Sequence, residues 1–109
     1  MAYSDRLNER ISTATARWNN TTRKKMFGGI CYLLNGNMFC GIQKNALIVR
    51  VGIDAAELAL QQPHVKPFSP TGKPMKGWVL VEQPAFQTEN ELNKWLLKAR
   101  QFTETLPVK

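Results

Sequence analysis

The chain has 109 residues, and its 15 lysines and arginines outnumber its 8 acidic residues, which gives a formal net charge of +7 at pH 7. This length predicts one domain, residues 1–109, that buries about 65% of the surface of the unfolded chain without a disulfide or a structural metal. The sequence contains no apolar run of the roughly 18 residues that a membrane span needs, and no signal-peptide pattern. We therefore expect a cytoplasmic protein without membrane contact.

The first predicted element is a helix that follows an N-cap at Ser4 and ends near residues 19–22. Apolar residues recur along it at helical spacing, and these are Leu7, Ile11, Ala14 and Trp18. Basic residues lie on the flank of this helix and in the segment that follows it. They form a candidate basic patch, which consists of Arg6, Arg10, Arg17, Arg23, Lys24 and Lys25. Such a patch favours an acidic partner.

Residues 26–51 are predicted to form three antiparallel strands joined by tight turns. Asn35-Gly36 is a strong hairpin signal, because a two-residue type I′ turn needs positive φ at both central positions. Lys44-Asn45 is predicted as a second tight turn. Together the two turns set the register of all three strands.

The register assigns each strand residue to a face, because successive side chains point to opposite sides of a sheet. The first turn places Cys31 opposite Cys40, and the second places Ile42 opposite Leu47. We expect the core face to consist of Cys31, Leu33, Met38, Cys40, Ile42, Leu47, Val49 and Val51. We expect the other face to be a mixed surface, with candidate interaction residues Tyr32, Phe39, Ile48 and Arg50.

The rest of the chain predicts two helices and two strands. A short helix capped by Asp54 covers residues 55–62, and a basic loop with a short edge strand follows over residues 63–77. Residues 78–83 form a buried strand, and a capping box at Thr88 begins the last helix. The predicted order is α-β-β-β-α-β-β-α, a two-layer α+β domain with an antiparallel sheet of about five strands and helices on one face.

No catalytic, cofactor-binding or metal-binding residue is expected. His64 is the only histidine and has no acidic or thiol neighbour in the sequence, whereas zinc usually takes three or four protein ligands. Cys31 and Cys40 lack CxxC spacing and are interpreted as small buried thiols. Gly28-Gly29 precedes a strand without the continuation of a phosphate-binding loop, so we expect a bulge or a close approach there.

A small nucleic-acid-binding module is the alternative to a protein-binding domain. Tyr32 and Phe39 would share the mixed face with Arg50, and sheets that bind single strands stack bases on aromatic rings. The basic patch would then contact the phosphates. The RNP pattern of such modules is absent, however, and the same aromatics could pack against a dimer partner or a loop.

Several short motifs in a fixed order resemble the N-terminal domain of the TfoX/Sxy family of bacterial competence regulators. The resemblance spans nearly the whole chain and includes the turn at Gly36, residues 49–51 and residues 106–109. Its two most specific motifs are MFGG and PMxGW. Their residues, for which we expect a structural role, are Met26, Phe27, Gly28, Gly29, Pro74, Met75, Gly77 and Trp78.

The resemblance implies a two-layer α+β fold similar to that of type III secretion chaperones, and no enzyme activity. In longer relatives this domain precedes a C-terminal domain of helix-hairpin-helix character, and the whole protein activates competence genes together with the cyclic AMP receptor protein. This chain ends at Lys109, so we expect a stand-alone domain. Our hypothesis is a non-enzymatic regulatory or adaptor domain that contacts an unidentified protein and forms a homodimer through the mixed sheet face.

Overall fold

The computed structural model describes residues 4–26 and 29–109. Six antiparallel strands form one sheet in the order β1-β2-β3-β4-β6-β5. The elements in chain order are α1 (Asp5–Ala14), β1 (Thr21–Met26), β2 (Gly29–Leu34), β3 (Asn37–Gln43), β4 (Ala46–Arg50), α2 (Ile53–Ala59), β5 (Val65–Pro67), β6 (Trp78–Val81), the 3-10 helix η1 (Gln83–Ala85) and α3 (Glu89–Thr103). The α+β class and the antiparallel sheet are confirmed, with one strand more than predicted.

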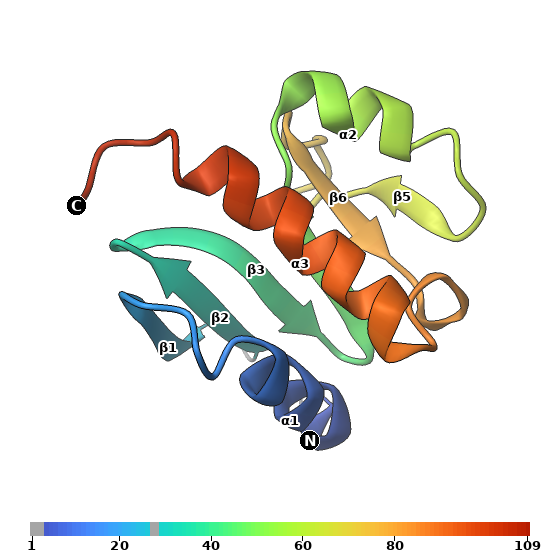
Figure 1. The fold of residues 1–109 in the computed structure, drawn as a ribbon. Helices are drawn as coiled ribbons and strands as arrows, with labels where there is room; N and C mark the ends of the chain where they lie inside the picture. The colour runs from blue at the N-terminus through green and yellow to red at the C-terminus, as the bar shows by residue number, and fades with distance from the viewer. Residues whose placement is uncertain (1–3, 27–28) are drawn as a thin grey trace.

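Helices α1 and α3 lie over the same face of the sheet (Figure 1). Leu7 and Ile11 of α1 and Leu92 and Leu96 of α3 are buried in one cluster with the strand residues beneath them. Ala56 and Ala59 of α2 join this cluster. Burial of each leucine or isoleucine stabilises the fold by about 1.5–3 kcal/mol, so the apolar stripes of the helices hold the two layers together.

Local hydrogen bonds determine where the two longer helices begin. Ser4 Oγ accepts a hydrogen bond of 3.1 Å from the backbone N–H of Leu7, as the predicted N-cap requires. Thr88 and Glu91 form the predicted capping box at the start of α3. The predicted N-cap at Asp54 is wrong, because α2 already begins at Ile53.

A β-bulge changes the register of the first hairpin between Tyr32 and Leu33. Leu33 pairs with Met38 as predicted, but Tyr32 pairs with Cys40, which leaves Phe39 as the extra residue. The predicted pair of Cys31 and Cys40 is therefore wrong. A shift of one residue moves every following side chain to the opposite face.

The core face of β2 is consequently the reverse of the predicted one. Ile30, Tyr32 and Leu34 belong to the core cluster, whereas Leu33 on the opposite face is only half-buried. The second hairpin keeps its predicted register, since Ile42 pairs with Leu47. The core positions predicted for this hairpin are confirmed for Cys40, Ile42, Leu47 and Val49.

Strand β1 was not predicted as a strand, because residues 21–26 show no alternation of apolar and polar side chains. It pairs with β2 from Thr21↔Leu34 to Met26↔Gly29 and forms one edge of the sheet. The consecutive cations Arg23, Lys24 and Lys25 are exposed on it. Charged residues on an edge strand disfavour pairing with other chains.

Candidate functional site

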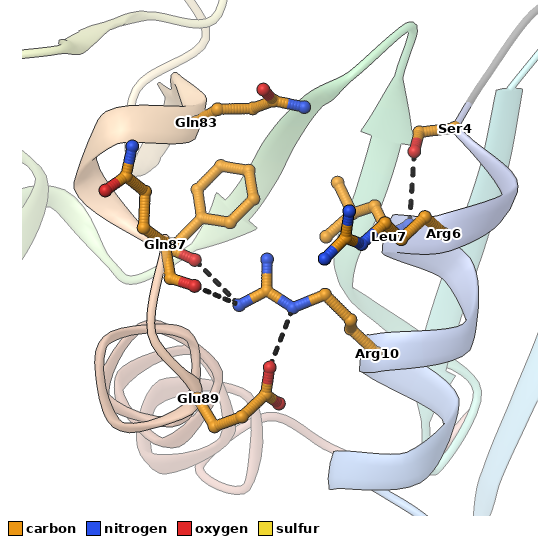
Figure 2. Close-up of a pocket in the computed structure, with 8 residues that line it drawn as sticks. Ser4, Arg6, Leu7, Arg10, Gln83, Gln87 and Glu89 are labelled. Carbon is orange, nitrogen blue, oxygen red and sulfur yellow. Dashed lines mark hydrogen bonds and ion pairs between the residues drawn. The ribbon is translucent and has the colours of Figure 1, made fainter.

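A cleft of about 300 Å³ lies between α1 and the segment that runs from η1 into α3 (Figure 2). Helix α1 supplies one wall, and residues 83–89 supply the other. The lining residues are Ser4, Arg6, Leu7, Arg10, Gln83, Phe86, Gln87 and Glu89. Guanidinium and carboxamide groups therefore surround a floor of apolar side chains.

Arg10 connects the two walls of the cleft. Its Nε donates a hydrogen bond of 2.9 Å to Glu89 Oε1, and its Nη2 donates to the backbone carbonyl of Phe86 at 2.8 Å. The same Nη2 lies 3.2 Å and 3.3 Å from the carbonyl oxygens of Gln87 and Thr88. These contacts fix the guanidinium in place, and its central carbon lies 5.7 Å from the centre of the Phe86 ring.

Arg6 lies one helical turn before Arg10 and points its guanidinium toward the same cleft (Figure 2). No acidic group of residues 4–26 or 29–109 lies within 4.0 Å of this guanidinium. On the opposite wall Gln83 extends its carboxamide over the cleft, whereas the carboxamide of Gln87 points away from the two guanidinium groups (Figure 2). The lining residues carry a net positive charge, because Glu89 balances only one of the two arginines.

The other residues of the predicted basic patch lie apart from this cleft. Arg23 Nη1 donates a hydrogen bond of 3.3 Å to Ser12 Oγ in a second, smaller cleft of about 220 Å³ beside Tyr32. Arg17 is exposed beyond the end of α1. The structure thus divides the predicted patch into separate groups of cations.

The predicted interaction residues Tyr32, Phe39, Ile48 and Arg50 do not form a common surface. Tyr32 and Phe39 are only 4% and 0% exposed and lie in the core under α1. The bulge is the physical reason, since it turns this part of the hairpin toward the helices. Ile48 is also buried and lies outside the core cluster, where it pairs with Gly41 and Leu80.

Arg50 packs between two aromatic rings. Its guanidinium carbon lies 5.5 Å from the centre of the Trp78 ring and 5.6 Å from that of Phe102. Such cation–π contacts contribute about 0.5–1 kcal/mol each at exposed sites. Arg50 therefore joins β4 and β6 to the end of α3.

Tyr32 ties β2 to α1 through its hydroxyl. The hydroxyl donates to the side-chain Oδ1 and backbone carbonyl of Asn8, and it lies 3.0 Å from Ser12 Oγ. Burial raises the pKa of Tyr32, and the hydrogen bond with Ser12 partly offsets that rise. The ring is thus held at both its apolar and its polar end, which suits a structural role.

Neither cysteine has the environment of a nucleophile. Cys40 is fully buried, and burial raises the pKa of its thiol well above the usual range, with nearby Cys31 adding a smaller effect. Burial also raises the pKa of Cys31. A reactive cysteine needs a depressed pKa and access to solvent. Within the described part of the chain, no group of three or more His, Cys, Asp and Glu residues is placed to hold a metal ion.

The PMxGW motif builds the junction between β6 and α2. The carbonyl of Gly77 accepts hydrogen bonds of 2.9 Å from the N–H of Val51 and 3.1 Å from that of Gly52. The ring of Trp78 lies 6.0 Å from that of Phe68. The expected structural role of this motif is consistent with these contacts, whereas Phe27 and Gly28 of the MFGG motif lie outside the described residues.

Three exposed apolar side chains at α2 were not recognised in the sequence. Ile53, Leu58 and Leu60 are 56%, 67% and 38% exposed, although each is a large aliphatic residue. The available signal was the excess of apolar residues over what a two-turn helix can bury on one side. The residues of the second wall of the cleft, Gln83, Phe86 and Gln87, carried no sequence signal.

The sequence of this chain matches the model of one protein family. A family model described as the TfoX N-terminal domain matches residues 13–103. The match covers every strand and helices α2 and α3, and it begins within α1. Searches of curated proteins and of solved structures found no match. No helix among residues 4–26 and 29–109 is both long enough and apolar enough to traverse a bilayer.

Proposed function

This chain belongs to the TfoX N-terminal domain family, and from that premise we propose that it is a regulatory or adaptor domain that works through contacts with another protein. The family is that of competence regulators, so the proposed role lies in the regulation of transcription. Catalysis is not part of the proposal. The raised pKa values of Cys31 and Cys40 support this, because they disfavour the thiolate that a cysteine enzyme needs.

The exposed apolar side chains of α2 are the observation that carries the proposal. Leu58 is 67% exposed, and Ile53 and Leu60 lie on the same short helix or at its end. Leu58 lies on a different side of the helix from Ile53 and Leu60, and burial of these side chains against a partner would stabilise the contact by about 25 cal/mol per Å² of apolar area. The surface of α2 replaces the sheet face as the proposed contact, because Tyr32 and Phe39 are buried.

A homodimer and a cytoplasmic location belong to the same proposal. Two α2 helices from two copies would cover each other's apolar side chains, and the free thiols of Cys31 and Cys40 suit a reducing compartment. Sedimentation of the wild type and of Leu58→Lys tests the dimer. We expect the wild type to dimerise and the variant to be a monomer. A monomeric wild type would contradict the homodimer, and the contact of α2 would then be with a different protein.

The test of a partner is quantitative affinity capture from the native cell extract with the wild type, Leu58→Lys and Leu97→Lys. Leu97 is the matched control, since it is 47% exposed on α3 and distant in sequence from α2. A partner that is lost with Leu58→Lys and retained with Leu97→Lys supports the proposal. Equal capture by all three proteins contradicts a contact through α2.

Nucleic-acid binding stays as the second proposed function, and it is supported by the exposed cations Arg23, Lys24 and Lys25 of β1. Base stacking on Tyr32 and Phe39 is no longer part of it, because both rings are buried. Binding of labelled DNA and RNA should then be electrostatic and weaken steeply between low and moderate salt. Lack of binding at low salt would rule this function out.

A further inference from the structure

Two arginines of α1 share the cleft between α1 and residues 83–89. Arg6 and Arg10 are one helical turn apart, so their like charges repel each other along one side of the helix. Glu89 pairs with Arg10 at 2.9 Å, and this single carboxylate leaves the cleft with an excess positive charge. An anion in the cleft would remove the remaining repulsion.

The donors that remain available in the cleft are well defined. Nε and Nη2 of Arg10 are occupied by Glu89 and by backbone carbonyls, whereas Nη1 has no hydrogen-bond partner among the residues that the structure describes. Figure 2 shows Nη1 pointing into the cleft between Gln83 and the guanidinium of Arg6. The fixed position of Arg10 means that this donor needs no reorganisation to meet a ligand.

The floor of the cleft strengthens any charged hydrogen bond made above it. Phe86 and Leu7 are 1% and 3% exposed and exclude water from one side. Hydrogen bonds between charged groups are stronger where the local dielectric constant is low. Guanidinium groups also match the planar geometry of carboxylate and phosphate oxygens better than an ammonium group does.

We propose that this cleft binds an oxyanion, either a carboxylate or a phosphate, between Arg6 and Nη1 of Arg10. The carboxamide of Gln83 extends over the same space and can donate a further hydrogen bond to the anion (Figure 2). The site is separate from the proposed contact of α2 and does not depend on it.

Backbone amide NMR spectra at constant ionic strength test the site, with inorganic phosphate and acetate as the two probes. We expect at least one probe to cause saturable shifts confined to residues 4–10 and 83–89. Arg6→Gln should lower the affinity for that probe about tenfold, which is the usual effect of losing one charge-assisted hydrogen bond. Arg17→Gln removes the same charge from an exposed arginine outside the cleft and should leave the affinity unchanged.

The comparison of the two probes identifies the source of the anion. Tighter binding of phosphate assigns the site to phosphate groups, and tighter binding of acetate assigns it to carboxylates. Shifts that do not saturate, or that lie outside the cleft, would overturn the site. Equal weakening by Arg6→Gln and Arg17→Gln would also overturn it, because that result would reflect net charge alone.

Discussion

Arg10 and Glu89 form an ion pair of 2.9 Å between helices that begin and end the fold. Only the arginine is partly buried, since the side chain of Arg10 is 20% exposed and that of Glu89 is 65% exposed. Arg10 also donates to the part-buried carbonyl of Phe86, which no other described group satisfies. The arginine is therefore the more important partner for stability.

Substitution of Arg10 by alanine should lower the free energy of unfolding by about 2 kcal/mol, because it removes a charged donor from a part-buried carbonyl. Glu89→Gln should cost less than about 1 kcal/mol, as is usual for an exposed ion pair. Urea denaturation of both variants and the wild type measures the two values. Equal losses would mean that the ion pair, and not the carbonyl bonds, holds α1 to residues 86–88.

Local sequence signals were sufficient for the starts of α1 and α3 and for the second hairpin, whereas α1 ends at Ala14, earlier than predicted. The capping box of Thr88 and Glu91 is specified by residues within one helical turn, so no distant contact is needed to predict it. The register at Lys44-Asn45 follows from the turn alone, and Lys44 has the positive φ of 57° that such a turn requires.

The bulge at Phe39 could not be predicted, because its cause lies in tertiary packing. The Phe39 ring lies 5.6 Å from that of Trp18 and 6.4 Å from that of Tyr32, so Phe39 is enclosed by residues from two other segments. Simple alternation along β3 carries no information about these contacts. The predicted interaction surface was wrong for this reason, since it depended on continuous alternation.

The cleft between α1 and residues 83–89 could not be predicted from the sequence for a different reason. Arg6 and Arg10 were recognised as one flank of α1, but the opposite wall comes from residues about eighty positions later in the sequence. Pairing of distant segments follows from the packing of α1 beside α3, not from a local motif. Only the basic half of the site was therefore predictable.

Gly52→Ala should destabilise the fold by about 2–4 kcal/mol. Gly52 has a φ of 90°, and an added Cβ would lie 2.7 Å from the Phe102 ring, so backbone strain and overpacking add together. Gly72→Ala is the matched control, since Gly72 has a φ of 88° and open space around its Cβ position. It should cost only about 1–2 kcal/mol of strain. Thermal and urea unfolding measure the loss of stability of both variants. Equal losses would show that the Phe102 ring moves away from the added Cβ without lowering the free energy of unfolding.

Cys31 and Cys40 should not form a disulfide in the folded protein. Cys31 pairs with Gly41 and Cys40 pairs with Tyr32, so the two side chains point to opposite faces of the sheet. A disulfide needs Cβ atoms that point toward each other. After treatment of the folded protein with diamide, mass spectrometry under denaturing conditions should find two alkylatable thiols. Complete conversion to an intramolecular disulfide would mean that the bulge is absent.

The free energy of unfolding should decrease as the pH rises above about 8.5, where the thiols of the unfolded chain begin to ionise. Burial raises the pKa of Cys40 in the folded state, so the folded chain keeps this proton after the unfolded chain has lost it. The folded state then binds more protons, and its stability falls with pH by at most about 1.4 kcal/mol per pH unit for one group. Below about pH 8 this contribution is fully present.

Cys40→Ala tests the assignment of this pH dependence to the buried thiol. The variant should be less stable at neutral pH, because it leaves a small cavity, yet its stability should fall less steeply between pH 8.5 and 10. Burial is the main cause of the raised pKa of Tyr32, and Cys40 adds a smaller effect, so the comparison is restricted to pH values below about 10, where Tyr32 has not begun to ionise. Urea denaturation under reducing conditions across this pH range provides the two slopes. Identical slopes would show that another group, and not Cys40, loses its proton on unfolding.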